Sequence, residues 1–214
     1  VISVVGDDLV ANELKDLFDN INVSRNGLIV EKNRKTSKKS RLIASQQQVL
    51  RYDMESIDDI SSQSCDEILG KLKKDIKKYD SIILSDYGKG VLTSSLTKEI
   101  IKLANENKVK VLADPKGKDY SKYKGAYTLT PNKKEAIEAT NIDIKDEESL
   151  IKALKSLQDT CELELALITL SEQGIAIFDD SLRIKPTVAR EVYDVTGAGD
   201  TVIASIAFAL GNNL

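Results

Sequence analysis

Short apolar runs alternate with amphipathic stretches along most of the chain. Several runs have the length and the Val, Ile and Leu content of buried strands: residues 1–5, 81–85, 109–113, 126–130, 165–169 and 175–178. Elsewhere, apolar residues recur at helical spacing and predict helices over residues 8–20, 65–79, 96–107, 149–157 and 202–210. Strands that alternate with helices indicate an α/β fold with a mostly parallel sheet.

Residues 22–53 interrupt this alternation. Within them, residues 27–31, 36–45 and 47–53 have the mixed pattern of short strands separated by polar turns. A chain of 214 residues suits one domain with a sizeable core. We therefore expect residues 1–214 to form a single domain, with residues 22–53 as a small β-insertion.

Composition excludes several classes of protein. The chain has no histidine, so Ser-His-Asp and Cys-His triads and histidine zinc sites cannot form within it. The net charge of −3 lacks the basic character of nucleic-acid readers, and no apolar run approaches the ~20 residues that cross a bilayer. Cys65 and Cys161 are isolated and fit neither a metal-ligand spacing nor a disulfide scaffold. We expect a cytoplasmic protein that binds neither nucleic acid nor membrane.

The most informative stretch is Asp-Val-Thr-Gly-Ala-Gly-Asp-Thr at residues 194–201, between an apolar run at residues 188–193 and the predicted helix 202–210. Its glycines let bare backbone approach a ligand, and the first amides of a helix favour an anion such as phosphate. An acid repels phosphate, so Asp200 fits better as the base for a hydroxyl that attacks the phosphate. The alternative is that Thr196 or Asp200 only caps the helix.

An acid and a lysine follow each of two successive predicted strands. Asp86 and Lys89 come after one strand, and Asp114 and Lys116 come after the next. Ligands of parallel sheets bind beyond the carboxyl ends of the strands, so these side chains are candidates for chemistry or binding. Solvated charges in glycine-rich turns are the alternative.

Asn132 and Glu135 stand at the start of the helix that follows residues 126–130. Pro131 before Asn132, and Glu135 three residues after it, have the spacing of a helix capping box. Their oxygen atoms also suit a hard ion such as Mg²⁺, directly or through water. The residues alone leave both roles open.

Cations crowd the β-insertion, at Lys32, Arg34, Lys35, Lys38, Lys39 and Arg41. Lys39 and Arg41 alternate with Ser40 and Leu42, so they share one strand face and are the better candidates for binding a phosphate group. A solvated edge strand protected by lysines is the alternative.

Residues 194–201 resemble the signature of the ribokinase (PfkB) family, whose members phosphorylate a sugar hydroxyl with ATP and Mg²⁺. The resemblance implies a ribokinase-like three-layer fold with a mostly parallel central sheet and with residues 22–53 as a β-lid over the sugar. It also implies that Asp200 is the catalytic base. The amides of Gly197, Ala198 and Gly199 would form the anion hole for the transferring phosphoryl group.

The same resemblance implies a nucleotide side of the site. The Asn-x-x-Glu sequence at Asn132 and Glu135 is similar to the family motif that orders Mg²⁺ and phosphate-bound water. A Thr-Leu-Gly-x-x-Gly turn of the family lies against the nucleotide, and this chain departs from it with Ser171 in place of the first Gly. The residues implied for ATP binding are Asn132, Lys133, Lys134, Glu135, Thr169, Ser171, Gly174 and Thr196.

Within the family, four motifs together resemble the heptose kinases of ADP-heptose and lipopolysaccharide synthesis. They are Ser-Asp-Tyr-Gly-Lys-Gly, Ala-Asp-Pro-Lys-Gly, Leu-Thr-Pro-Asn-x-x-Glu and Glu-Val-Tyr-Asp-Val-Thr-Gly-Ala-Gly-Asp-Thr, and residues 46–53 are similar to the lid segment of those kinases. The implied reaction phosphorylates D-glycero-β-D-manno-heptose 7-phosphate at the anomeric hydroxyl. The implied substrate residues are Lys39 and Arg41 for the existing phosphate, with Asp86, Lys89, Asp114 and Lys116.

Two other functions stay open at this point: a ribokinase or fructokinase acting on another sugar, and a nucleotide-binding fragment without turnover. The Gly-Gly sugar motif of the family is not found, and the chain ends one helix after the signature, so we expect a sequence truncated at both ends. The resemblance further implies a homodimer through the β-lid and an adenylyltransferase domain fused downstream.

Overall fold

The computed structural model describes residues 1–45, 47–188, 197–212 and 214. The chain divides into two compact units, residues 1–74 with 88–93, and residues 75–87 with 94–214. Most of the predicted strand 188–193 lies outside the described residues, as do Gln46 and the first part of the glycine-rich motif, Asp194, Val195 and Thr196. The interpretation of residues 1–214 as one kinase domain stays a prediction.

The first unit begins with a parallel pair of strands, as the apolar run at its start predicts. β1 (Ser3–Gly6) pairs with β2 (Leu28–Glu31), and α1 (Leu9–Asn20) connects them. Asp8 caps α1, and its carboxylate also accepts a hydrogen bond of 2.9 Å from the amide of Thr36. The cap explains why the predicted and observed helices start together.

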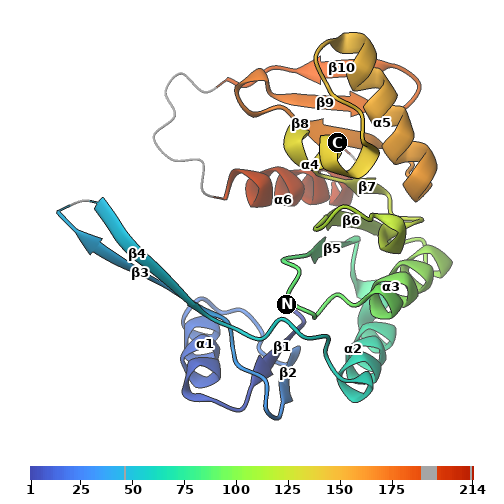
Figure 1. Ribbon diagram of the computed structural model, residues 1–214. Helices are drawn as coiled ribbons and strands as arrows, with labels where there is room; N and C mark the ends of the chain where they lie inside the picture. The colour runs from blue at the N-terminus through green and yellow to red at the C-terminus, as the bar shows by residue number, and fades with distance from the viewer. Residues whose placement is uncertain (46, 189–196, 213) are drawn as a thin grey trace. The chain divides into compact units, whose positions relative to one another are not determined.

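The first unit also contains a long antiparallel hairpin, which Figure 1 shows as a ribbon extending away from α1, β1 and β2. β3 (Lys38–Ala44) pairs with β4 (Gln47–Met54), with a register shift after Leu42. Arg41 lies directly opposite Arg51. The side chains of both strands are largely exposed, including the apolar ones of Leu42, Ile43, Val49, Leu50 and Tyr52.

α2 (Ser62–Asp75) follows the hairpin and ends earlier than predicted. The chain continues as a 3₁₀ turn, η1 (Ile76–Lys78), so the predicted helix 65–79 is two elements of different pitch. The start of α2 is tied to β2, because the Glu31 carboxylate accepts hydrogen bonds from Ser61 and Ser64. Negative charge at a helix N-terminus is favourable, so this contact stabilises both elements.

The second unit contains the mostly parallel sheet that the alternation of strands and helices predicts. β5 (Ser81–Ser85), β6 (Lys110–Asp114) and β7 (Thr128–Leu129) are parallel. Single parallel bridges pair Thr128 with Leu165 and Asn132 with Thr169, so a further strand continues this side of the sheet. That strand is β8 (Ala166–Thr169), which continues antiparallel into β9 (Ile175–Phe178) and β10 (Leu182–Lys185). The sequence did not indicate β10, which has charged residues at alternate positions and is mostly exposed.

Helices cover the parallel strands of the second unit. α3 (Ser94–Glu106) and α6 (Ala198–Gly211) both contact β6, while α4 (Lys133–Thr140) and α5 (Glu147–Cys161) contact β8. Successive side chains of a strand point to opposite faces, and all three central residues of β6 are buried, so both faces of this strand are covered. The core of the second unit therefore lies around β6.

Several predicted bounds differ from the observed ones for local reasons. The predicted strand 126–130 shortens to Thr128–Leu129, and the predicted helix 149–157 extends because a capping box of Asp146 with Ser149 starts it earlier. The prediction that residues 81–85 are buried on both faces is wrong. Ile83 is 41% exposed, because β5 forms the edge of the three-stranded sheet. No helix within the described ranges is long and apolar enough to span a membrane.

Candidate active site at the carboxyl edge of the parallel sheet

Asp86 directly follows β5 and belongs to a buried hydrogen-bond network. Its side chain is only 4% exposed, and its Oδ2 accepts hydrogen bonds from Lys122 Nζ at 2.5 Å and from the Tyr123 hydroxyl at 2.7 Å. The Tyr123 oxygen in turn accepts a bond of 3.0 Å from the amide of Lys116. The network therefore links the ends of β5 and β6 to the turn η2 (Ser121–Tyr123).

Asp114 stands next to Asp86 at the end of β6, and the amide of Asp86 donates to the Asp114 carbonyl at 3.1 Å. Burial, followed by the negative charges of Glu135 and Asp200, raises the pKa of the Asp114 carboxyl from 3.8 to about 6. A carboxyl whose pKa is raised by burial and by neighbouring acids is a candidate for a functional site. Three predicted site acids, from β6, α4 and α6, are thus brought together within the second unit.

Asn132 and Glu135 form the capping box that their spacing allows. Asn132 Oδ1 accepts from the amide of Glu135, and Glu135 Oε2 accepts from the amide of Asn132, both at 3.0 Å. The other oxygen, Glu135 Oε1, lies 3.7 Å from Lys116 Nζ. The capping role is confirmed, and it leaves one carboxylate oxygen of Glu135 outside the cap.

The predicted nucleotide residues meet at the ends of β7 and β8. A parallel bridge pairs Asn132 with Thr169, and the Thr169 amide donates to the Pro131 carbonyl at 2.9 Å. Ser171 begins the 3₁₀ turn η3 (Ser171–Gln173) with a φ of 54°. Gly174 closes it, and a Cβ there would lie 2.0 Å from the Lys185 carbonyl oxygen, so only glycine fits. Lys133 and Lys134 lie in the first turn of α4, and Lys134 is exposed.

The second half of the glycine-rich motif starts α6. Gly197 is the N-cap, with a φ of 78° and no side-chain cap, and Asp200 is the third residue of the helix. The alternative that Asp200 is the N-cap is therefore wrong. The amides of Ala198 and Gly199 belong to the first turn, where helix N–H groups lack an intrahelical acceptor. Thr196 lies outside the described residues.

Asp200 adjoins an open hollow along α6, whose lining residues are Asp200, Thr201, Ala204, Ser205 and Phe208. The carboxylate also lies beside the phenol of Tyr87. Burial, then the charges of Asp200 and Asp114, raises the pKa of that phenol. The Tyr87 hydroxyl thus stays protonated at neutral pH and can serve as a hydrogen-bond donor to Asp200.

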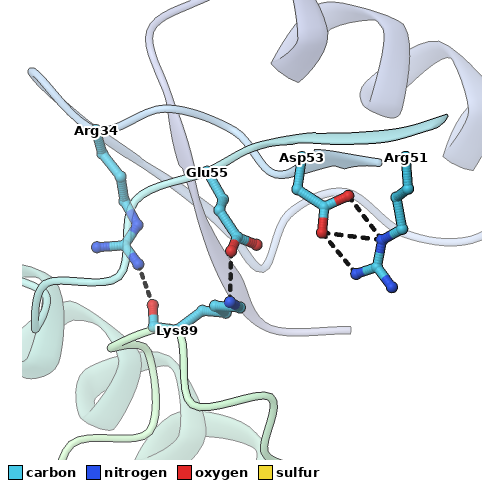
Figure 2. Close-up of polar contacts among 5 residues, drawn as sticks. All are labelled: Arg34, Arg51, Asp53, Glu55 and Lys89. Atoms are coloured by element: carbon cyan, nitrogen blue, oxygen red, sulfur yellow. Dashed lines mark hydrogen bonds and ion pairs between the residues drawn. The ribbon is translucent and has the colours of Figure 1, made fainter. Parts of the chain in front are cut away.

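The remaining predicted substrate residues belong to the first unit. Lys39 and Arg41 lie on one face of β3, opposite Asp53 and Arg51 of β4. Lys89 belongs to the same Ser-Asp-Tyr-Gly-Lys-Gly motif as Asp86. It nevertheless lies in the segment 88–93, which packs with residues 1–74. Its ammonium forms an ion pair with the Glu55 carboxylate (Figure 2).

Sequence reasoning missed the partners of these residues. Lys122 and Tyr123 are separated from Asp86 by 36 and 37 positions, and Glu55 is separated from Lys89 by 34. A single sequence carries no signal for such tertiary contacts. The sequence signal for η2 is weak. Lys and Tyr alternate in the Tyr-Ser-Lys-Tyr-Lys stretch of residues 120–124, which indicates a polar turn with one apolar side.

The predicted ligands of Mg²⁺ are Asn132 and Glu135, and their arrangement shows whether they could hold the ion. Within the ranges that the structure describes, no group of three or more acids or cysteines is arranged to hold a metal ion. Asn132 and Glu135 supply only oxygen atoms, one of which, Glu135 Oε1, is not used by the capping box. Mg²⁺ commonly keeps several waters and takes one or two protein carboxylates, so these two residues fit a water-mediated site.

An acid beside a helix N-terminus, a candidate nucleotide turn and an acidic sheet edge are the features expected of an α/β phosphotransferase. Residues 1–214 match the pfkB family of carbohydrate kinases over their whole length. The chain therefore belongs to the pfkB family of carbohydrate kinases. The prediction of this family is confirmed.

Curated relatives of high identity cover the whole chain. It is 78% identical over 214 residues to the bifunctional protein HldE of Aliarcobacter butzleri, covering 100% of this chain and 45% of that protein. It is 57% identical over 210 residues to HldE of Sulfurimonas denitrificans, covering 98% of this chain and 44% of that protein. The chain thus spans about half the length of the curated relatives it matches.

Solved structures share the fold. Ribokinase of Arabidopsis thaliana, complexed with ribose and ATP, superposes with a TM-score of 0.76 at 19% identity, covering 99% of this chain and 68% of that one. Phosphofructokinase-2 of Escherichia coli superposes with a TM-score of 0.75 at 14% identity, covering 98% and 69%. The ribokinase-like α/β fold that the resemblance implied is confirmed.

Proposed function

We propose that this chain is the kinase portion of an enzyme that transfers the γ-phosphoryl group of ATP to D-glycero-β-D-manno-heptose 7-phosphate. The acceptor is the anomeric hydroxyl and the product is the 1,7-bisphosphate, an intermediate on the route to ADP-heptose and the lipopolysaccharide core. The family match, the HldE relatives and the four sequence motifs support this substrate. The single observation that carries the reaction type is Asp200 in the first turn of α6, next to the first-turn amides.

In this proposal, Asp200 accepts the proton of the anomeric hydroxyl as that oxygen attacks the γ-phosphorus. The amides of Gly197, Ala198 and Gly199 donate hydrogen bonds to the transferring phosphoryl oxygens, and the positive end of the helix dipole favours their charge. Phosphoryl transfer needs little from the protein beyond positioning, charge neutralisation and one base. The donors of α6 and the carboxylate of Asp200 meet those demands.

ATP would lie against the ends of β7 and β8, along Asn132, Lys133, Lys134, Glu135, Thr169, Ser171, Gly174 and Thr196. Mg²⁺, when bound, would supply positive charge that neutralises the phosphates of ATP. Asn132 and Glu135 would hold it through water, while the capping box keeps both side chains oriented. Asp86, Lys89, Asp114 and Lys116 would bind the sugar phosphate.

The hairpin β3–β4 would act as the β-lid of residues 22–53. Lys39 and Arg41 share its cationic face and would hold the 7-phosphate. Its exposed apolar residues, Leu42, Leu50 and Tyr52, would pack against a second copy in a homodimer. Since the HldE relatives are bifunctional proteins of about twice this length, we further propose a fused adenylyltransferase domain and cytoplasmic activity.

The substrate assignment predicts that the 7-phosphate matters. The full-length protein should phosphorylate heptose 7-phosphate far better than heptose, ribose or fructose, in an assay that follows ADP release. Arg41→Ala should raise the KM for heptose 7-phosphate about 10-fold and spare the KM for ATP, because a phosphate contact through arginine is charge-assisted. Arg41→Lys should restore this only in part, since lysine lacks the bidentate fork. Equal use of unphosphorylated sugars, or equal effects on both substrates, would contradict the assignment.

The metal assignment predicts a separable effect of Glu135. Glu135→Gln keeps an oxygen that can accept from the amide of Asn132, so the capping box and the melting temperature should be preserved. The magnesium concentration that gives half-maximal activity should nevertheless rise, because the variant lacks the carboxylate charge. Glu135→Ala should in addition lower stability by about 1 kcal/mol. An unchanged magnesium requirement in Glu135→Gln would leave Glu135 with the cap alone.

A further inference from the structure

The segment that carries Lys89 is fastened to the root of the hairpin by its main chain. Arg34 Nη1 donates to the Asp58 carbonyl at 3.0 Å. Nη2 of the same guanidinium donates to the carbonyl of Lys89, the contact that Figure 2 shows. Arg34 therefore binds two turns at once. A rigid fork of donors is the arginine property that such a double contact needs.

Gly90 brings this segment into direct backbone contact with its surroundings. The amide of Ile60 donates to the Gly90 carbonyl at 2.9 Å. Gly90 has a φ of 72°, and a Cβ there would lie 1.9 Å from the Asp58 carbonyl oxygen, so no other residue fits. The backbone at the Lys89 carbonyl and at Gly90 is thus fixed.

Glu55 fixes the side chain of Lys89. The Glu55 carboxylate and the Lys89 ammonium form an ion pair whose side chains are 17% and 33% exposed. Within the ranges that the structure describes, Glu55 Oε2 is buried and has no hydrogen-bond partner, so only Oε1 holds the lysine. An acceptor that takes one of three ammonium hydrogens leaves two donors for another anion.

A second acid of the same strand region gives a contrast. Asp53 holds Arg51 through three hydrogen bonds, yet the Arg51 side chain is 47% exposed and both residues come from β4 (Figure 2). That pair joins neighbours on one strand, whereas the Glu55 pair joins residues 34 positions apart. Glu55 is thus placed to set the position of a distant lysine.

We propose that Glu55 is a positioning residue for the sugar phosphate, acting through Lys89, with Arg34 as the main-chain support of the same lysine. This inference rests on the proposed function, because Lys89 is the residue that touches the substrate. Glu55 carries a negative charge and would repel a phosphate in direct contact, so it acts by holding the ammonium in one of its rotamers. A lysine held in place loses less rotamer freedom when the phosphate binds.

The test is a double-mutant cycle in the full-length protein with the variants Glu55→Ala, Lys89→Ala and both together. We measure KM for heptose 7-phosphate, KM for ATP, turnover number and melting temperature. Each single variant should raise the KM for the sugar phosphate about 10-fold and leave the KM for ATP within about 2-fold. The double variant should be no worse than Lys89→Ala, since Glu55 has no target without the lysine.

Conservative variants separate positioning from mere stability. Glu55→Gln keeps an acceptor oxygen for the ammonium. Its KM for the sugar phosphate should therefore lie much closer to that of the wild type than the KM of Glu55→Ala does. Arg34→Lys cannot reach both carbonyls and should raise the same KM without affecting that for ATP. Glu13→Gln is the control. Glu13 forms an ion pair of 3.1 Å with Lys38 of the hairpin, so this variant removes a different ion pair of the hairpin. It should behave as wild type.

The outcomes distinguish this inference from the proposed function. Failure of the wild-type protein to phosphorylate the heptose phosphate would overturn the function and, with it, the inference. An active wild type in which Lys89→Ala raises the sugar KM while Glu55→Ala does not would overturn the inference alone. Additive effects in the double variant, or a fall in melting temperature with both KM values unchanged, would also overturn it.

Discussion

Replacing Asp200 by Asn in the full-length protein is expected to lower the turnover number by about 10²–10⁴-fold. The amide keeps the size and the hydrogen-bonding capacity of the side chain but cannot accept the proton of the sugar hydroxyl. ATP binding should be unchanged or slightly tighter, because a negative charge near the phosphates is removed. Turnover number, KM for ATP and KM for the sugar phosphate are to be measured side by side.

The position of Asp200 in α6 separates a catalytic role from a helix-capping role. Asp200 is the third residue of α6 and Gly197 is its cap, so Asp200→Asn removes no N-cap. The helix loses only a favourable charge at its N-terminus, a change of about 0.3–1 kcal/mol. Glu147→Gln is a matched control, since Glu147 is an acid in the first turn of α5 in the same unit. A turnover number near wild type in Asp200→Asn would contradict the assignment of the base.

The elements that the sequence predicted best are those with strong local signals. The bounds of β5 and β9 coincide with their apolar runs, and α1 starts beside its capping Asp8. The sequence did not predict β10, because this strand lacks a strong local signal. Its residues are charged at alternate positions and mostly exposed, so its pairing with β9 rests on backbone hydrogen bonds rather than on a hydrophobic pattern.

The candidate site was predictable in its residues but not in their partners. Strand ends collect at one edge of a parallel sheet, so the rule that places Asp86 and Asp114 there is independent of the rest of the chain. The same rule does not predict the position of Lys89. Lys89 follows Asp86 by three positions, yet the chain passes into the other compact unit between Tyr87 and Gly88. Tertiary contacts of Arg34 and Glu55, which no local pattern encodes, hold it there.

The acidic edge of the sheet has an energetic cost that the sequence could not show. Asp114 has a pKa raised to about 6, because it is desolvated beside Glu135 and Asp200. Natural proteins retain such repulsion mainly at functional sites, where charges are gathered for a ligand rather than for stability. Lys116, whose ammonium lies 3.7 Å from Glu135 Oε1, already offsets part of this repulsion, and Mg²⁺ is the further counter-charge that the proposed reaction would need.

Asp86→Ala is expected to lower the free energy of unfolding by about 3–5 kcal/mol, the range for breaking a buried ion pair by removing one partner. The Asp86 and Lys122 side chains are 4% and 19% exposed, so water cannot replace the lost carboxylate. Lys122 would keep a desolvated charge, and the Tyr123 hydroxyl would lose its acceptor. Urea denaturation of the wild type and the variant measures the difference.

Two further variants decide whether the loss comes from the broken pair. In Asp86→Ala with Lys122→Met, an apolar chain replaces the ammonium that has lost the Asp86 carboxylate, so stability should recover by at least 1 kcal/mol relative to Asp86→Ala. Asp119→Asn is the control. Asp119 is exposed and accepts from the amide of Ser121 at 2.8 Å, and an asparagine oxygen can accept the same local hydrogen bond, so the variant should stay within about 0.5 kcal/mol of wild type. A loss below 1 kcal/mol in Asp86→Ala would mean that solvent reaches the network, and it would contradict the stabilising role of the buried pair.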